Sequence, residues 1–144
     1  MDPAERAALE AWLTPAQLEL FDAMHVADRR HGLDVVTTLR SEGAIDPDLL
    51  VAGLLHDAAK GDTSVWPRVA YSLGQAYGPW IWRLVRVLPG MSGSLELLRD
   101  HAARSAVLAE AAGCSVATVE LIRNQEAPTD PINGRLLLLA DEAN

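Results

Sequence analysis

The segment that most constrains the fold is a run of seven residues without a polar side chain, Leu49 to Leu55, followed at once by His56-Asp57. Such a run is typical of a buried segment, so two ionisable side chains at its end need an explanation. Moving an imidazole and a carboxylate out of water costs roughly several kcal/mol unless they are paired, hydrogen-bonded or bound to a cation. A bound metal ion would satisfy both residues at once.

The rest of the chain favours an all-α fold. Hydrophobic residues make up 49% of the 144 residues, aromatic residues are few, and the alternation typical of strands is almost absent. The length fits one domain, residues 1–144, built on a single core. We expect a bundle of about seven to nine helices. The predicted helices cover residues 4–13, 16 to about 28, about 28 to 41, 47–60, 64–77, 80–88, 94–112, 115–125 and 135–142.

Cap residues set most of these limits. Thr14-Pro15, Asp46-Pro47 and Ser115 are typical helix starts, and Gly43 and Gly113 are typical stops. We interpret the large aromatic residues of the middle helices as core residues; they are Trp66, Tyr71, Trp80 and Trp82.

Charge and cysteine content exclude several functions. The net charge of −8 argues against a nucleic-acid polymer as partner, because phosphate backbones are held by clustered Lys and Arg, but it is compatible with a small phosphorylated ligand. Cys114 is the only cysteine, so neither a disulfide nor a thiolate zinc site is expected. No apolar stretch approaches the roughly 20 residues that cross a bilayer, and no secretory signal is evident. We expect a cytoplasmic protein without a membrane partner.

Several polar residues lie on apolar helix faces, as the spacing of three, four and seven residues shows. His31, His56, His101 and Asp141 each share a face with apolar residues, and Asp57 lies about 100° further round the helix from His56. Taken singly, His31 or His101 is better explained as a hydrogen-bonded core residue than as a ligand. Their occurrence on separate helices of one small domain favours a shared site.

His25 is the control for this test. It shares its predicted face with Leu18 and Phe21, so periodicity alone does not select ligands. For His25 we expect a hydrogen-bonded core position rather than a functional role.

The order and context of these residues resemble the HD-domain superfamily of metal-dependent phosphohydrolases. That pattern has an isolated His, then an adjacent His-Asp, then a distant Asp, and here these are His31, His56-Asp57 and Asp141. The matching segments are Asp28-Arg29-Arg30-His31, Leu54-Leu55-His56-Asp57-Ala58-Ala59-Lys60-Gly61 and Leu139-Ala140-Asp141, within about residues 20–142.

The resemblance implies an all-helical domain in which His31, His56, Asp57 and Asp141 bind one divalent ion. Two imidazoles and two carboxylates suit Mn, Fe, Co, Ni, Zn or Mg, so the ligand types leave the metal open. The implied reaction is hydrolysis of a phosphomonoester or phosphodiester of a small metabolite, for which a nucleotide is the first candidate. The ion would bind a phosphoryl oxygen and lower the pKa of a bound water.

Four charged residues near the pattern have alternative roles. Asp57 could also orient the water, and Lys60 is within reach of a phosphate or is a solvated lysine at a helix end. Arg29 and Arg30 could hold a phosphate, although an arginine pair at a helix start is more often surface charge.

The pattern departs from that of the two-metal members at one position. His101 fits the first of their additional histidines, but Gln125 stands where the second is expected. Glutamine is a poor transition-metal ligand beside imidazole, so one ion is expected rather than two. His101 and Gln125 could then bind a substrate phosphate or a water, or satisfy each other as a buried polar pair.

Two other functions stay open. The chain could be a non-catalytic HD-like domain that binds a ligand or metal as a sensor or interaction module, or a structural helical module with a hydrogen-bonded core. Asp141 is followed by only three residues, so its turn is expected to fray unless a metal or a partner subunit of a homo-oligomer orders it.

Overall fold

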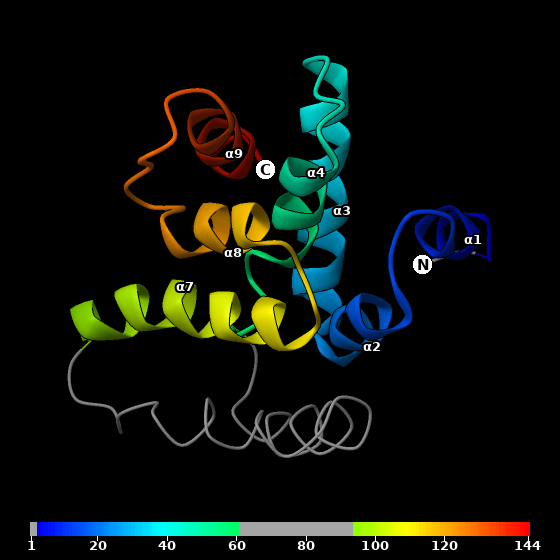
Figure 1. Cartoon of the computed structure of the whole chain (residues 1–144), viewed down its shortest axis with the longest axis horizontal. Helices are drawn as coiled ribbons and strands as arrows, with labels where there is room; N and C mark the ends of the chain where they lie inside the picture. Colours follow the sequence, from blue (N-terminus) through cyan, green and yellow to red (C-terminus); the bar gives the residue numbers. More distant parts are fainter. Residues whose placement is uncertain (1–2, 61–93) are drawn as a thin grey trace.

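The computed structural model describes residues 3–60 and 94–144, and within these ranges it contains seven helices and no strand (Figure 1). The predicted all-α class is confirmed. The predicted helices at 64–77 and 80–88, together with Trp66, Tyr71, Trp80 and Trp82, lie outside the described residues. The helices are α1 (Pro3–Glu10), α2 (Pro15–Ala23), α3 (Val26–Ser41), α4 (Pro47–Leu55), α7 (Ser94–Ala111), α8 (Val116–Arg123) and α9 (Asn133–Glu142).

The predicted cap residues do begin and end the helices. The Thr14 hydroxyl accepts the Gln17 backbone N–H, and the Gln17 side chain accepts the Thr14 N–H in return, which is a complete capping box. Asp46 accepts the N–H of the second residue after it, and Ser115 accepts that of the third. Gly43 and Gly113 follow α3 and α7 with φ of 85° and 73°, a backbone conformation that favours glycine.

The predicted core position of His25 is wrong. The chain is extended at Met24 and His25, with ψ of 153° and 148°, so α2 ends at Ala23 rather than continuing towards Asp28. The face that His25 would have shared with Leu18 and Phe21 is therefore interrupted. His25 is exposed and begins α3, where its Nδ1 accepts the Ala27 N–H at 3.3 Å.

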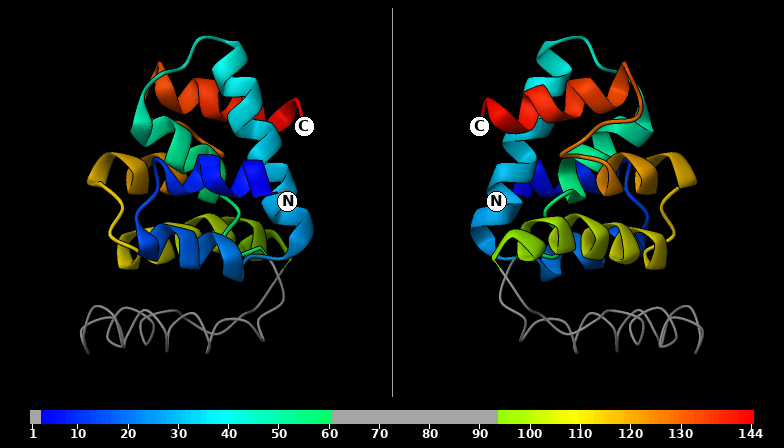
Figure 2. Two further views of the ribbon diagram at one scale, coloured as in Figure 1. Left: turned by 90° about the vertical axis from the view of Figure 1, so that its right-hand side faces the viewer. Right: turned by 90° about the vertical axis from the view of Figure 1, so that its left-hand side faces the viewer.

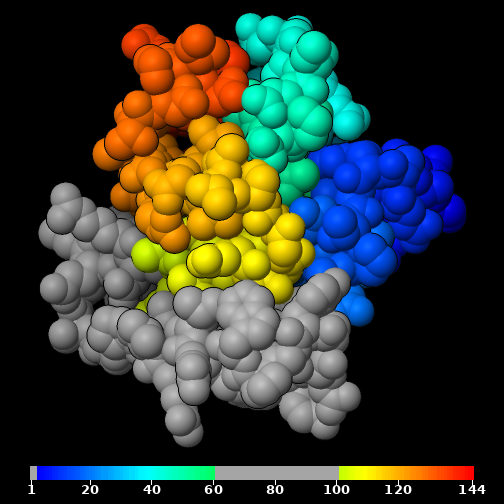
Figure 3. All heavy atoms as spheres, in the orientation of Figure 1, coloured from blue at the N-terminus to red at the C-terminus, as the bar shows by residue number. Residues whose placement is uncertain are grey.

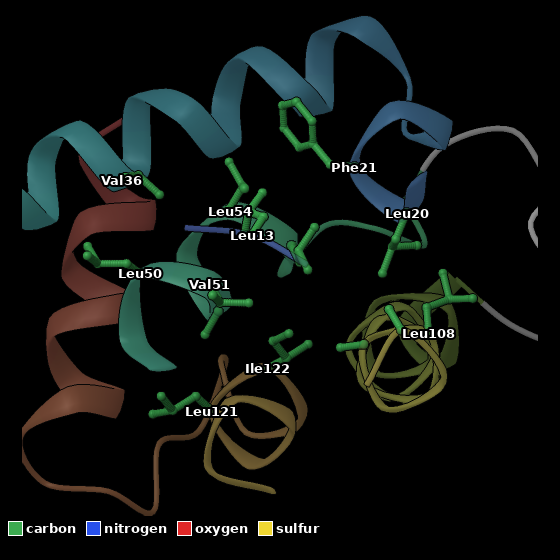
Figure 4. Close-up of a cluster of buried hydrophobic side chains, with 14 of the residues drawn as sticks. Leu13, Leu20, Phe21, Val36, Leu50, Val51, Leu54, Leu108, Leu121 and Ile122 are labelled. Atoms are coloured by element: carbon green, nitrogen blue, oxygen red, sulfur yellow. The ribbon is translucent and has the colours of Figure 1, made fainter. Parts of the chain in front are cut away.

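The core surrounds α4. All seven residues from Leu49 to Leu55 are buried, as expected for a helix that is apolar all round. Helices α3, α8 and α9 pack against α4, and α7 packs against α8. Figure 4 shows Val51 of α4 directed towards Ile122 of α8, while Leu50 points to the side of α4 on which α9 lies. Cys114 packs against this core, and burial raises the pKa of its thiol to about 11.

Helix α9 brings a segment late in the chain back to α3 and α4. The two views of Figure 2 show α9 lying across α3, with the C-terminal residue beside α3. In the space-filling view, α9 and the α3–α4 region adjoin at one end of the molecule, with α8 next to them (Figure 3). In the part of the chain that the structure describes, no helix is long and apolar enough to cross a membrane.

Candidate metal centre

Three side chains from distant parts of the sequence meet beside the end of α4. The Oδ1 atom of Asp141 lies 2.8 Å from Nε2 of His31 and 3.1 Å from Nε2 of His56. The two imidazole rings are 5.1 Å apart between centroids. Among the described residues, these three form a group whose potential ligand atoms all lie within 4.8 Å of one another. We refer to His31, His56 and Asp141 as the His/Asp cluster.

Each member of the cluster is placed by a different element. His31 lies in the second turn of α3, and Asp141 lies in the last turn of α9. His56 is the residue directly after α4, and Asp57 follows in the turn that replaces the predicted continuation of the helix to Lys60. His56 and Asp57 are about 1% and 2% exposed, so the most buried part of the site is the end of α4.

The ring of His56 has a fixed orientation. Its Nδ1–H donates to the Gly53 carbonyl at 2.9 Å. In the neutral imidazole this leaves the lone pair on Nε2, facing the Asp141 carboxylate. Two acceptors at this distance repel each other unless a proton or a cation lies between them. The geometry therefore favours positive charge at the centre of the cluster.

The pKa values show the same demand for positive charge. Burial lowers the pKa of His56, but the hydrogen bond to Asp141 and the charges of Asp57 and Asp141 outweigh burial, so that its pKa is raised. The hydrogen bond from His56 holds the pKa of Asp141 well below its usual range, although burial acts in the other direction. Either an imidazolium or a metal ion can supply the charge that the carboxylate requires.

The donor set fits a divalent ion. Imidazole nitrogens and carboxylate oxygens bind such ions at about 2.0–2.2 Å, which puts neighbouring ligand atoms roughly 3 Å apart. The separations of 2.8 and 3.1 Å in the cluster match this spacing. The hydrogen bond from His56 to Gly53 is also the kind of contact that orients a metal-binding histidine.

Asp57 lies beside the cluster. Its Oδ2 atom is 3.8 Å from Nε2 of His31 and 3.6 Å from Nε2 of His56, and it accepts a hydrogen bond from Nζ of Lys60 at 2.9 Å. Burial lowers the pKa of Lys60, but the hydrogen bond and charge of Asp57 outweigh it and the pKa is raised. The Lys60 side chain is 54% exposed, so its ammonium group lies at the edge of the site and reaches solvent.

His101 and Gln125 form a pair on the other side of Asp57. The Gln125 Nε2 atom is 3.2 Å from Nε2 of His101, and His101 Nε2 is 3.6 Å from Asp57 Oδ1. Gln125 is 5% exposed, and its Oε1 has no hydrogen-bond partner among the described residues. The two side chains contact each other, but they do not satisfy each other in full, because Gln125 Oε1 is left without a partner among the described residues. The amide donates to the same nitrogen that His101 would offer to a metal ion.

Arg29 and Arg30 are not brought to the cluster. Arg30 is 60% exposed in its side chain and pairs with Asp34 and Glu5, while Arg29 lies 4.0 Å from Asp22. Together with Phe21, Val26 and Leu33 they line a separate hollow of about 470 Å³. For the exposed Arg30, surface charge matches these contacts better than a role in holding phosphate at the cluster. Arg29 is half-buried, and its Nε has no hydrogen-bond partner among the described residues.

Three supporting residues escaped the sequence analysis. The Gly53 carbonyl orients His56, the Ser105 hydroxyl accepts the Ala59 N–H at 3.0 Å, and Asn144 bonds Ala140 and Thr38. Ser105 lies one turn after His101 on α7, so the face of His101 could have identified it. The Asn144 contacts join the end of α9, beside Asp141, to α3.

Comparison with known proteins adds no relative to this description. The searches find no matching family model, no matching curated protein and no matching solved structure.

Proposed function

We propose that the chain is a metal-dependent phosphohydrolase of the HD-domain type that acts on a small phosphorylated metabolite, with a nucleotide as the first candidate. The observation that carries the proposal is the convergence of His31 and His56 on one oxygen of Asp141. Two histidines and a carboxylate from three helical segments, one of them buried, are a costly arrangement for a structural core.

The residues around the cluster suit this chemistry. A bound divalent ion would supply Lewis-acid polarisation of a phosphoryl oxygen and a more acidic water. Lys60 offers a solvent-reaching ammonium group 2.9 Å from Asp57, which can pair with a phosphate oxygen. The buried Asp57 carboxylate can hold an attacking water by accepting its hydrogen bond, and can take up its proton. The net charge of −8 does not prevent such a site from binding a small anionic substrate, because the metal ion and Lys60 supply positive charge at short range.

The first test is metal content. Mass spectrometry of the purified chain should find one Mn, Fe, Co, Ni, Zn or Mg ion per molecule, and His56→Ala should lose it. His25→Ala is the matched control, because His25 is exposed and lies outside the cluster.

The second test is hydrolysis. A panel of nucleoside monophosphates, cyclic nucleotides and nitrophenyl phosphate mono- and diesters is incubated with Mn²⁺, Co²⁺, Ni²⁺ or Mg²⁺. We expect metal-dependent turnover that Asp57→Ala reduces by at least about 100-fold, as for the loss of a general base. A chain that binds no metal and turns over nothing in the panel contradicts the proposal.

One observation favours a second candidate, a non-catalytic ligand-binding or metal-binding sensor domain. The Gln125 amide donates a hydrogen bond to Nε2 of His101. This nitrogen is then not free to bind a reacting substrate. Tight binding of a metal or nucleotide that raises the melting temperature without any hydrolysis would support this candidate over the enzyme.

A further inference from the structure

At Gly32 the backbone of α3 lies close to the backbone of α4. Gly32 is buried and directly follows His31. A Cβ atom at this position would lie 2.5 Å from the carbonyl oxygen of Leu54, 3.2 Å from its carbonyl carbon and 3.4 Å from its Cα. All three atoms belong to the backbone, so no side-chain rotation can relieve the overlap. An alanine here requires the two helices to separate by roughly 1 Å, since ordinary carbon contacts begin near 3.5 Å.

This contact lies between two members of the cluster. Gly32 is adjacent to His31, and Leu54 is two residues before His56. A separation of α3 from α4 at this point therefore moves the two imidazoles apart, from a centroid distance of 5.1 Å. Asp141 Oδ1 contacts both rings within 3.1 Å and cannot follow both of them.

We propose that Gly32 is a positioning residue for the metal centre: its missing side chain sets the spacing of His31 and His56 that lets one divalent ion contact both. This inference rests on the proposed function, because it needs the cluster to bind a metal. Metal–ligand distances tolerate deviations of only about 0.2 Å. Apolar side chains can adjust when the helices separate by roughly 1 Å, so this separation lowers metal affinity far more than it weakens apolar packing.

Two other buried glycines show what is particular to Gly32. A Cβ at Gly53 would meet the tip of Leu39 at 2.8 Å, and a flexible side chain can move away. A Cβ at Gly134 would meet the side chain of Pro128 at 2.9 Å, in the loop before α9. The atoms nearest to that Cβ belong to Pro128 and Asp130 and not to the cluster, so Gly134 is a matched control for tight packing without a metal role.

The test compares wild type, Gly32→Ala and Gly134→Ala. Each metal-free protein is titrated with Co²⁺, and the visible absorption bands of the bound ion give both the affinity and the coordination. We expect Gly32→Ala to bind Co²⁺ about 10- to 100-fold more weakly than wild type, with altered bands, as for changes in residues that orient metal ligands. Gly134→Ala is expected to match wild type in affinity and spectrum, whatever its loss of stability.

The folded fraction is controlled by circular dichroism, and trimethylamine N-oxide is added to all three proteins if Gly32→Ala is partly unfolded. Wild-type affinity and spectrum in a folded Gly32→Ala protein would overturn the inference while leaving the metal centre intact. Equal weakening by Gly134→Ala would overturn it too, because the effect would then be general destabilisation. A wild-type chain that binds no Co²⁺ refutes the metal centre itself, and Co²⁺ binding without hydrolysis refutes only the enzymatic function.

Discussion

At the scale of single residues, the turn after α4 depends on a polar contact that crosses the core. Ser105 of α7 is fully buried, and its hydroxyl accepts the N–H of Ala59, which is 8% exposed. This bond fixes the turn that holds His56 and Asp57 at the end of α4. A buried N–H without an acceptor costs more than an average hydrogen bond contributes, because its lost hydration is not replaced.

We therefore expect Ser105→Ala to lower the free energy of unfolding by about 1–3 kcal/mol, as measured by urea denaturation. Ser41→Ala is the matched control. The Ser41 hydroxyl bonds the Thr38 carbonyl at an exposed helix end, so its loss should cost less than about 0.5 kcal/mol. Equal effects of the two substitutions would show that the Ser105 contact contributes nothing particular to the turn.

At the scale of helices, most limits were predictable because caps are local. Thr14, Asp46 and Ser115 begin helices through bonds within three residues, which the sequence displays directly. The break at Met24–His25 was missed because the apolar pattern runs through it without a glycine or proline. The start of α9 was placed two residues late, at 135 instead of 133, because its first N–H groups are satisfied by Asp130, which lies outside the helix.

The candidate site, like the helix limits, was predictable from the sequence only in part. The pattern His31, His56-Asp57, Asp141 predicted which residues meet, and the structure brings three of them together with Asp57 beside them. Periodicity could not do this, since His25 passed the same test and is exposed. The close approach of Gly32 to Leu54 was not predictable, because a glycine within a helix does not reveal which backbone lies opposite.

Asp130 gives the start of α9 a pH dependence. Its carboxylate accepts the N–H groups of Ile132 and Asn133, and these bonds lower its pKa below the usual value. A carboxylate with a lowered pKa in the folded state stabilises the fold above its unfolded pKa of about 3.9 and loses that effect as the pH falls. We expect wild type to be more stable than Asp130→Asn at pH 7, with the difference decreasing as the pH falls below about 3.9. Parallel stability curves for the two proteins, measured by urea denaturation between pH 3 and 7, would contradict this.

At the scale of the whole molecule, the His/Asp cluster joins segments far apart in the chain. His31 and Asp141 are separated by 110 positions, and His56 and Asp141 by 85. A metal ion bound by all three therefore closes long loops, and because the unfolded chain offers no such site, binding stabilises the folded state. The same ion would neutralise the charge that the Asp141 carboxylate brings to the buried ring of His56.

Metal removal should consequently destabilise the entire fold rather than the site alone. At a free metal concentration about 100 times the Kd, binding contributes about 2.7 kcal/mol, and a domain of this size then gains roughly 5–10 °C in Tm. We expect a chelator to remove that increment from wild type and to leave the Tm of His56→Ala unchanged. His25→Ala serves as control: loss of the α3 cap lowers its Tm, yet the increment on adding metal should equal that of wild type. An identical Tm of wild type with metal and with chelator would mean that the positive charge in the cluster is a proton.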